Sequence, residues 1–273
     1  MQDRKALQAG TSHFLGQNFA RAQEITFQDQ EGVEQFAWTT SWGVSTRLVG
    51  ALLMTHSDDD GLILPPRLAP KHVVILPIYR SDEERQQVLP YCEQLQRDLH
   101  AVSFVEGRVE VQLDDRDIRG GEKNWQHVKR GVPLRAEVGP KDLAKDGVFL
   151  ARRDTGEKKP VARSEFVATV ATMLEDIQQN LYSRAKKLQE DNSRHIDSLD
   201  EFRDFFTPEK ADKPEIHGGF AWSHFVDTPE VEEILKPMKV TIRCIPLEEG
   251  DGPGKCLFTG QPSTKRAVFA KAY

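Results

Sequence analysis

The sequence predicts an α/β fold in the middle of the chain and α+β structure on either side, and three observations lead to this prediction. Apolar, strand-like runs alternate with helical stretches between residues 71 and 175. A long amphipathic helix follows, with Val170, Leu174 and Ile177 in one apolar stripe. Short strands with one helix then make up residues 207–273. The alternation in the middle favours a mostly parallel or mixed sheet.

The chain divides into three predicted domains. Residues 1–70 end at the Pro-Pro of "GLILPPRLAP", through which no helix can continue. Residues 71–175 form the α/β domain. Residues 176–273 form a helical linker and a small C-terminal domain. With 273 residues, the chain is too long for one small domain.

The elements of the α/β domain follow from local patterns. The continuous apolar run "HVVILPIY" is typical of a strand buried on both faces. Ser81 followed by Glu84 is a capping box, which opens a helix that runs to about His100. Strands are predicted at "RVEVQLDD", "PLRAEVG" and "GVFLARRD". A short helix is predicted at "EKNWQHVKRG", with Gly131 at its end, and a hairpin turn at "DTGEKKP".

The outer segments are less regular. In the first, "QAGTSHFLGQNF" reads as a polar loop, "QDQEGVEQ" as a hairpin, residues 62–64 as a short strand, and "SWGVSTRLVGALLMTH" as a helix buried on most of its faces. In the last, helix is expected over residues 164–206, and a second helix begins at Thr228-Pro229. Strands are expected at "GGFAWSHFV", "VTIRCIPL" and "AVFAKAY", with a turn at "EEGDGPGK".

Composition excludes several classes of protein. The sequence contains no run of about 18 apolar residues, so it predicts no membrane span. The first residues lack the apolar core of a signal peptide. The three cysteines include no CxxC motif, which argues against a disulfide framework and against a four-thiolate zinc site. We expect a cytoplasmic protein. The net charge of −6 argues weakly against RNA binding, because one local basic patch is sufficient for it.

Arg47 is the first candidate functional residue, because it lies in an otherwise apolar helix. A buried guanidinium costs several kcal/mol, by order of magnitude, unless an anion answers it. Hydroxyls and glycine precede the helix, where free backbone N–H groups favour anions. The anion is either a nucleotide phosphate or a core carboxylate, and composition alone favours the carboxylate.

Two further stretches carry candidate chemistry. The loop around Gly10 and Gly16 gathers neutral hydrogen-bonding groups and His13, which can read a small ligand or move a proton. The alternative is a turn that caps itself. Residues 113–142 mix basic and acidic side chains, which suits RNA phosphates and base edges. A solvated, salt-bridged surface is the alternative there.

Several long motifs together resemble one known family. These are "QAGTSHFLGQNFARA", "TTSWGVSTRLVGALLMTHSDDDGLILPPRLAPKHVVILPIYRSDEE", "DDRDIRGGEKNWQHVKRGVPLRAEVGPKDL", "ARRDTGEK" and the terminal "FAKAY". In this order they resemble prolyl-tRNA synthetase, a class II aminoacyl-tRNA synthetase, in its archaeal/eukaryotic-like form. The similarity covers essentially the whole chain.

The resemblance implies a division of the chain by function. Residues 1–70 are similar to the end of a class II catalytic core with an antiparallel sheet, and "GVSTR" is similar to its motif 3. Residues 71–175 are similar to the anticodon-binding domain, and the rest to the C-terminal domain. In this family the terminal tyrosine, here Tyr273, reaches back toward the active site.

The resemblance also implies roles for particular residues. Those that would hold ATP, with Mg²⁺, are Gln8, Thr11 and Arg47. Those that would line the proline and adenylate pocket are His13, Trp42, Gly43 and Ser45. Those that we expect to read the anticodon of tRNA(Pro) are Arg119, Lys123, Glu137 and Lys141. No catalytic residue is assigned, because positioning and charge neutralisation do most of the work in this chemistry.

Two departures from the family pattern shape the expected activity. Motifs 1 and 2 are not found upstream of "QAGTSH", so we expect this chain alone to be inactive, and the implied homodimer to belong to the complete protein. Only Cys256 matches the four-cysteine zinc site of many relatives, so no zinc or other metal is expected. The resulting function is a proline–tRNA ligase present as an incomplete chain. The alternative is a non-catalytic module that binds tRNA or a partner.

Overall fold

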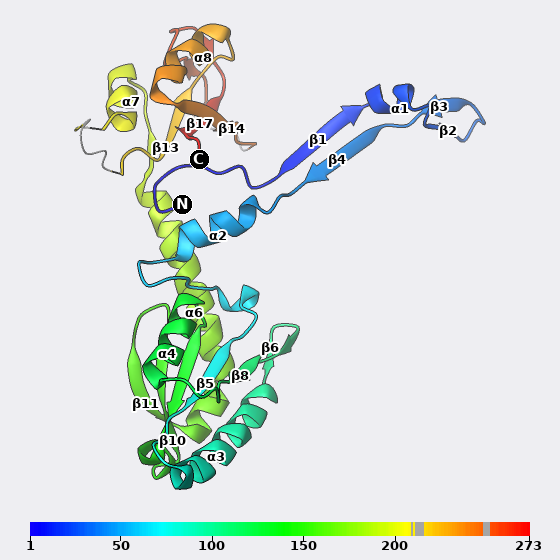
Figure 1. Ribbon diagram of the computed structural model, residues 1–273. Helices are drawn as coiled ribbons and strands as arrows, with labels where there is room; N and C mark the ends of the chain where they lie inside the picture. Colours follow the sequence, from blue (N-terminus) through cyan, green and yellow to red (C-terminus); the bar gives the residue numbers. More distant parts are fainter. Residues whose placement is uncertain (209, 211–215, 248–251) are drawn as a thin grey trace. The chain divides into compact units, whose positions relative to one another are not determined.

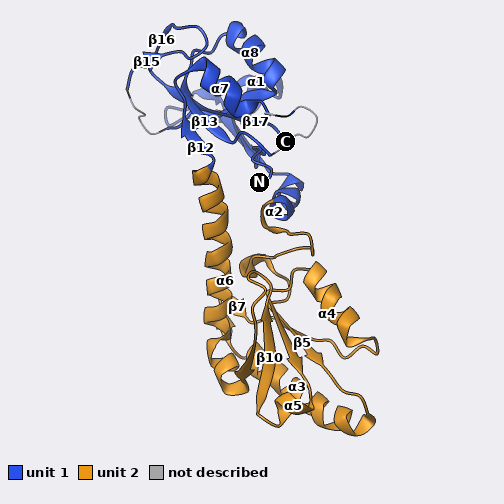
Figure 2. Ribbon diagram, turned by 90° about the vertical axis from the view of Figure 1, so that its left-hand side faces the viewer, with its two compact units in different colours: residues 1–54, 192–273 blue, residues 55–191 orange. Residues whose placement is uncertain are grey.

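The computed structural model describes residues 1–208, 210, 216–247 and 252–273. The chain forms two compact units (Figure 2). Unit 1 comprises residues 1–54 and 192–273, and unit 2 comprises residues 55–191. The sequence placed boundaries at 70/71 and 175/176 instead, so these three domains remain a prediction. Segments from both ends of the chain share unit 1.

Unit 2 contains a mixed five-stranded sheet, as the sequence predicted. Its strands lie in the order β11-β10-β9-β5-β8 (Figure 1). β5 pairs in parallel with both β8 and β9, whereas β10 is antiparallel to β9 and to β11. The strand bounds are β5 Val73–Pro77, β8 Val111–Leu113, β9 Leu134–Val138, β10 Gly147–Arg152 and β11 Lys158–Ala162, with a small hairpin of β6 Ser103–Phe104 and β7 Gly107–Arg108 beside them.

Helices cover both faces of this sheet. They are α3 Asp82–His100, α4 Gly120–Lys129, α5 Pro140–Leu143 and α6 Arg163–Asp191, and a 3-10 turn η1 spans Pro66–Leu68. Apolar residues of α3 and α6 pack with one face, which includes Val73 and Ile75, whereas Val74 and Leu76 belong to a separate cluster on the opposite face. Figure 2 shows α6 and α4 on opposite sides of the sheet. β5 is therefore buried on both faces, as its apolar run predicted.

The helix α3 begins where the capping box predicted. Ser81 is its N-cap, and the Ser81 hydroxyl accepts a hydrogen bond from the Glu84 N–H at 3.3 Å. The Glu84 carboxylate in turn accepts the Arg80 N–H at 2.7 Å. Three acidic residues in the first turn favour the positive end of the helix dipole. These local contacts fix the point at which the chain leaves the carboxyl end of β5.

A strap of residues 58–64 lies along α4. The Leu62 N–H donates to Lys129 O at 3.0 Å, and the Leu64 N–H donates to Gly131 O at 3.3 Å. Residues 62–64 were predicted as a strand. They make backbone hydrogen bonds to the end of α4, but they do not belong to a strand of the sheet. Gly131 ends α4, as predicted, with a φ of +72°. A Cβ there would approach the Leu62 backbone oxygen to 2.7 Å, so this contact requires glycine.

Unit 1 begins with a two-stranded antiparallel ribbon. Its strands are β1 Thr11–Gly16 and β4 Thr39–Gly43. Between them lie the short helix α1 Asn18–Ala22 and the hairpin of β2 Thr26–Gln28 and β3 Glu34–Phe36, at one end of the ribbon (Figure 1). The predicted hairpin at "QDQEGVEQ" is confirmed. The stretch "TSHFLG", expected as part of a polar loop, is a strand because it pairs along its length with β4.

The helix α2 Arg47–His56 follows the ribbon and differs from its prediction. None of its residues is buried, and the Leu48 and Val49 side chains are 40% and 59% exposed. The expectation of a helix buried on most faces is therefore wrong for the residues that the structure describes. The apolar composition reports what the helix can bury, whereas burial needs a neighbouring surface.

The rest of unit 1 is a four-stranded sheet with its own core. The strands lie in the order β12-β13-β17-β14, and Phe202 and Phe269 are among the fully buried side chains. The strands are β12 Ser193–His195, β13 Phe220–His224, β14 Val240–Cys244 and β17 Arg266–Lys271, with a small hairpin of β15 Gly254–Lys255 and β16 Pro262–Ser263. The helices are α7 Leu199–Phe206 and α8 Pro229–Leu235, followed by the 3-10 turn η2 Lys236–Met238.

The C-terminal part departs from the sequence prediction at the end of α6. Helix was expected through residues 164–206, but α6 ends at Asp191, because residues 193–195 pair as a strand with β13 before α7 begins. The turn predicted at "EEGDGPGK" falls partly on residues 248–251, which lie outside the described residues. The predicted strands and the helix begun at Thr228-Pro229 are confirmed.

Replacing Gly131 by alanine tests the close contact between the strap and α4. Gly156, in the turn between β10 and β11, has a similar φ of +73°, but a Cβ added there would meet no atom within 4 Å, so it is the matched control. We expect Gly156→Ala to lower the free energy of unfolding by about 1–2 kcal/mol through φ alone. Gly131→Ala should cost a further ~1–3 kcal/mol from overpacking. Equal losses in chemical denaturation would contradict the tight contact.

Candidate functional site

The ribbon brings together the three residues predicted to hold ATP. The Gln8 side-chain amide donates to the Thr11 hydroxyl at 3.1 Å, and Arg47 Nη1 donates to Gln8 Oε1 at 3.4 Å. Gln8 lies just before β1, Thr11 begins it, and Arg47 begins α2. Thr11 is also the strand partner of Gly43. A guanidinium, an amide and a hydroxyl thus form one connected polar cluster at the start of the ribbon.

The Arg47 side chain has a different partner from the one that composition favoured. Its guanidinium bonds the amide of Gln8 and makes no carboxylate ion pair among the described residues. Arg47 is exposed rather than buried, so its charge needs no buried anion. The Ser45 hydroxyl accepts the Arg47 backbone N–H at 3.3 Å, at the start of α2. The interpretation of a core arginine paired with a carboxylate is therefore wrong, and the guanidinium is accessible to a ligand.

The ribbon has two chemically different faces. In the register of β1 and β4, Ser12 pairs with Trp42 and His13 pairs with Ser41. Because successive side chains of a strand point to opposite faces, His13 shares a face with Thr11 and Ser41, and Trp42 lies on the other face. The polar face therefore includes His13, Gly43 and the Thr11 hydroxyl. The strand geometry separates Trp42 from His13, although the sequence grouped both in one pocket.

The end of the chain contacts the beginning of the chain within unit 1. The Tyr273 N–H donates to Ala6 O at 3.1 Å, and the Ala6 N–H donates to Lys271 O at 2.9 Å. Ala6 and Ala272 form a parallel bridge. Ala6 lies two residues before Gln8, so Tyr273 is tied to the segment that leads into the polar cluster. Backbone hydrogen bonds make this connection.

The second group of predicted residues lies in unit 2, at the carboxyl edge of its parallel strands. β5, β8 and β9 run in the same direction, so the loops after Pro77, Leu113 and Val138 meet at one edge. The Ile78 N–H donates to Val138 O at 2.8 Å, which joins two of these loops. A Cβ on Gly120 would lie 3.3 Å from Ile78 Cδ1, which places the start of α4 beside them.

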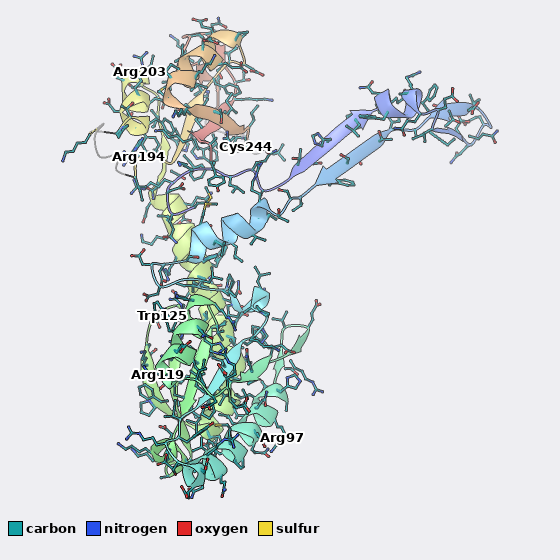
Figure 3. The ribbon with its side chains drawn as sticks, viewed as in Figure 1. Arg97, Arg119, Trp125, Arg194, Arg203 and Cys244 are labelled. Carbon is teal, nitrogen blue, oxygen red and sulfur yellow. The ribbon has the colours of Figure 1, made fainter. Side chains whose placement is uncertain are left out.

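Two of the residues predicted to read an anticodon are exposed at this edge. Arg119 is the N-cap of α4, and Figure 3 shows it at one end of that helix, with Trp125 farther along. Lys141 lies in α5, directly after β9, and Glu137 is half-buried in β9 itself. The structure thus brings Arg119, Glu137 and Lys141 to one edge of the sheet.

Lys123 has a different environment from these three residues. Its side chain is 4% exposed, and its ammonium donates to the backbone oxygen of Asp114 at 3.2 Å. Lys123 therefore holds the loop after β8 instead of standing free at the surface. Burial of α4 on this side, which the charge-rich sequence did not reveal, explains the difference.

Asp114 is a site residue that sequence reasoning missed. Its carboxylate accepts from Arg116 Nε and Nη2 at 2.7 and 2.6 Å, and it lies 2.8 Å from His127 Nε2. The hydrogen bonds from Arg116 hold the pKa of this carboxyl well below its usual range, although its burial opposes that shift. Burial lowers the pKa of His127. The available signal was the position of "LDDRD" at the end of a predicted strand.

A second ion pair, between a buried arginine and a partly exposed aspartate, ties the strap to the sheet. Arg153 is 7% exposed, and its guanidinium donates to both carboxylate oxygens of Asp58, at 2.7 Å from Nη1 and 2.5 Å from Nη2. This hydrogen bonding lowers the pKa of Asp58. Arg153 Nε also donates to Val128 O of α4 at 3.2 Å. The pair therefore fixes the strap and α4 together.

Side chains that commonly bind metals are dispersed in the described part of the chain. No group of three or more His, Cys, Asp or Glu side chains there could hold a metal ion. Cys92 and Cys256 are buried and Cys244 is exposed, and all three are free thiols. Among the helices of the same residues, none combines the length and apolar composition that a membrane span requires.

Two family models match separate parts of the chain. Residues 72–173 match the model described as "Anticodon binding domain", which covers most of unit 2. Residues 212–273 match the model described as "Prolyl-tRNA synthetase, C-terminal". Arg119, Glu137 and Lys141 lie within the first match, and Tyr273 ends the second.

Similar proteins are found among bacteria. The chain is 57% identical over 273 residues to the proline–tRNA ligase of Rhodopirellula baltica, covering all of this chain and 53% of that protein. It is 53% identical to the proline–tRNA ligase of Bdellovibrio bacteriovorus, covering 54% of it, and 53% identical to proline–tRNA ligase 2 of Anaeromyxobacter dehalogenans, covering 55% of it. The chain spans about half the length of the curated relatives that it matches.

Proposed function

We propose that this chain belongs to a proline–tRNA ligase, which activates proline with ATP and transfers it to tRNA(Pro). The activity is that of the complete protein. The observation that carries the proposal is the polar cluster of Gln8, Thr11 and Arg47, which lies in a chain similar over its whole length to proline–tRNA ligases. The match of unit 2 to an anticodon-binding domain supports the tRNA partner.

The polar cluster suits ATP chemically. The Arg47 guanidinium is exposed and offers a fork of N–H donors to phosphate oxygens. Gln8 and Thr11 add an amide and a hydroxyl beside it. Attack of the proline carboxylate on the α-phosphate gives prolyl-adenylate and pyrophosphate, and the terminal hydroxyl of the tRNA then takes the prolyl group. The role of Arg47 is to neutralise phosphate charge, and Mg²⁺ accompanies ATP as the resemblance implies.

The polar face of the ribbon is the proposed side of the proline and adenylate pocket. His13 and Gly43 share this face with Thr11, and Ser45 lies at the start of α2 next to Arg47. An exposed imidazole at this position can orient a substrate by hydrogen bonding. We propose that Trp42 supports the pocket from the opposite face of the ribbon.

The carboxyl edge of the unit 2 sheet is the proposed anticodon-binding surface. Arg119 and Lys141 supply cations for phosphate, and Glu137 supplies an acceptor for base amino groups. Lys123 acts from within, through the Asp114 loop. From the resemblance we also propose the archaeal/eukaryotic-like form, a homodimer in the complete protein and a cytoplasmic location.

A chimeric enzyme tests the proposed activity. The segment of the Rhodopirellula baltica ligase that matches this chain is replaced by residues 1–273, and proline-dependent exchange between ATP and pyrophosphate is measured. We expect exchange and prolylation of tRNA(Pro), because the inserted chain supplies the polar cluster and is 57% identical to the segment that it replaces. Arg47→Ala in the chimera should lower kcat/KM for exchange by about 100-fold, since one charge-stabilising donor is typically worth ~10²–10³.

Controls decide what a negative result means. The unaltered Rhodopirellula ligase must be active in the same assay, and the chimera must show cooperative unfolding. A folded chimera without exchange contradicts the ligase proposal. If such a chimera still binds tRNA(Pro), the non-catalytic tRNA-binding alternative is favoured.

Charge reversal tests the proposed anticodon surface separately. We expect Arg119→Glu and Lys141→Glu in this chain each to weaken binding of a proline tRNA by about 5-fold or more, because each replaces attraction to RNA by repulsion. Arg97→Glu is the matched control, since α3 begins at the carboxyl edge of the sheet and Arg97 lies in its last turn, at the far end of the helix. Unchanged affinity in the two edge variants removes those residues from the site.

A further inference from the structure

We propose that Asp114 and His127 are positioning residues, which hold the guanidinium of Arg116 ready to contact acceptor atoms of single-stranded RNA at the carboxyl edge of unit 2. This inference rests on the proposed function, because it assumes that unit 2 binds tRNA. It concerns three residues that the sequence-based set of anticodon contacts did not include.

Asp114 is anchored where the chain leaves β8. Its backbone N–H donates to Ile75 O of β5 at 3.0 Å, so the residue is fixed at the end of this strand. The residue is 2% exposed, and its side chain is completely buried. A buried carboxylate is costly unless it is paired and hydrogen-bonded. Something must therefore compensate its charge.

The guanidinium of Arg116 compensates the charge of Asp114. The Asp114 carboxylate binds the Nε and Nη2 edge of the guanidinium in a bidentate pair at 2.7 and 2.6 Å. Such a pair fixes the plane of the guanidinium as well as its place. Nη1 is not engaged by Asp114, and the Arg116 side chain is 45% exposed. The arginine is thus held by its Nε and Nη2 edge, while the side chain as a whole stays accessible.

His127 of α4 also supports the Asp114 carboxylate. His127 is fully buried, and its Nε2 lies 2.8 Å from the Asp114 carboxylate. An ionised carboxylate only accepts hydrogen bonds, so Nε2 must carry the proton and donate it. His127 Nδ1 is buried without a hydrogen-bond partner among the described residues, which fits a neutral ring whose Nδ1 bears a lone pair. The imidazole therefore orients the carboxylate that orients Arg116.

The network of Asp114, Arg116 and His127 lies between α4 and the loop after β8. Lys123 lies one helical turn before His127 and donates to the backbone oxygen of Asp114. Lys123 and His127 thus both hydrogen-bond Asp114, in the loop after β8. Arg119 lies at the N-terminus of the same helix. An exposed arginine with several accessible rotamers loses conformational entropy on binding, whereas a pre-oriented arginine loses less. The network provides this pre-orientation at the proposed RNA surface.

A double-mutant cycle tests the positioning role. Binding of the anticodon stem-loop of a proline tRNA to the full 273-residue chain is measured for Arg116→Gln, Asp114→Asn and the double variant. We expect Arg116→Gln to weaken affinity about 10-fold, and Asp114→Asn by a similar factor. The double variant should bind no more weakly than Arg116→Gln alone, because Asp114 acts through Arg116.

A purely structural role gives a different pattern. Asp114→Asn would then weaken binding by the same factor whether or not Arg116 is present, and this result overturns the proposal. Unchanged affinity in Arg116→Gln also overturns it. Arg97→Gln is the matched control, because Arg97 hydrogen-bonds the nearby Gln94 of its own helix, away from the proposed surface, and should leave affinity unchanged.

A second pair of variants covers the case in which Asp114→Asn does not fold. His127→Gln retains a donor where Nε2 lies, whereas His127→Leu removes it, so affinity should fall several-fold in the leucine variant and recover in the glutamine variant. Equal affinities in these two variants overturn the positioning role. Failure of the unaltered chain to bind the stem-loop contradicts the proposed tRNA function and this inference together. If the unaltered chain binds the stem-loop and Arg116→Gln binds it with the same affinity, only this inference is contradicted.

Discussion

The pairing of β5 with a parallel neighbour on each side is the constraint on which unit 2 depends. All five residues of β5 are buried, because helices cover both faces of the sheet. Burying each valine, leucine or isoleucine contributes about 1.5–3 kcal/mol. Since β8 and β9 run parallel to β5, the loops after all three strands open at one edge. The position of the proposed RNA surface therefore follows from the direction of three strands.

Buried polar contacts then convert this edge from a set of loops into a defined surface. Asp114 fixes the guanidinium of Arg116, and Lys123 and His127 connect the same loop to α4. In unit 1 the same logic operates with neutral groups, where Gln8 links Thr11 to Arg47. In both units, rigid strands set the positions and polar contacts set the orientation of the functional side chains.

Sequence patterns predicted what local chemistry determines, and missed what tertiary packing determines. The capping box at Ser81, the apolar run of β5 and the glycine at the end of α4 each act within a few residues, so their predictions were confirmed. The exposure of α2 and the burial of Lys123 depend on which surfaces meet, which periodicity does not encode. The strand register, invisible in the sequence, placed His13 and Trp42 on opposite faces. The Asp114 network was missed because its members are 13 positions or fewer apart in a stretch that reads as ordinary mixed charge.

Mapping the RNA contact by NMR tests the central claim most directly, because it reports on the whole sheet edge at once. The anticodon stem-loop of a proline tRNA is titrated into the isotopically labelled chain, and backbone amide shifts are followed. The account predicts the largest shifts in residues 78–81, 114–120 and 139–141, the three loops at the carboxyl edge of β5, β8 and β9. Shifts confined to residues 70–72 and 100–110, at the opposite edge, would contradict it.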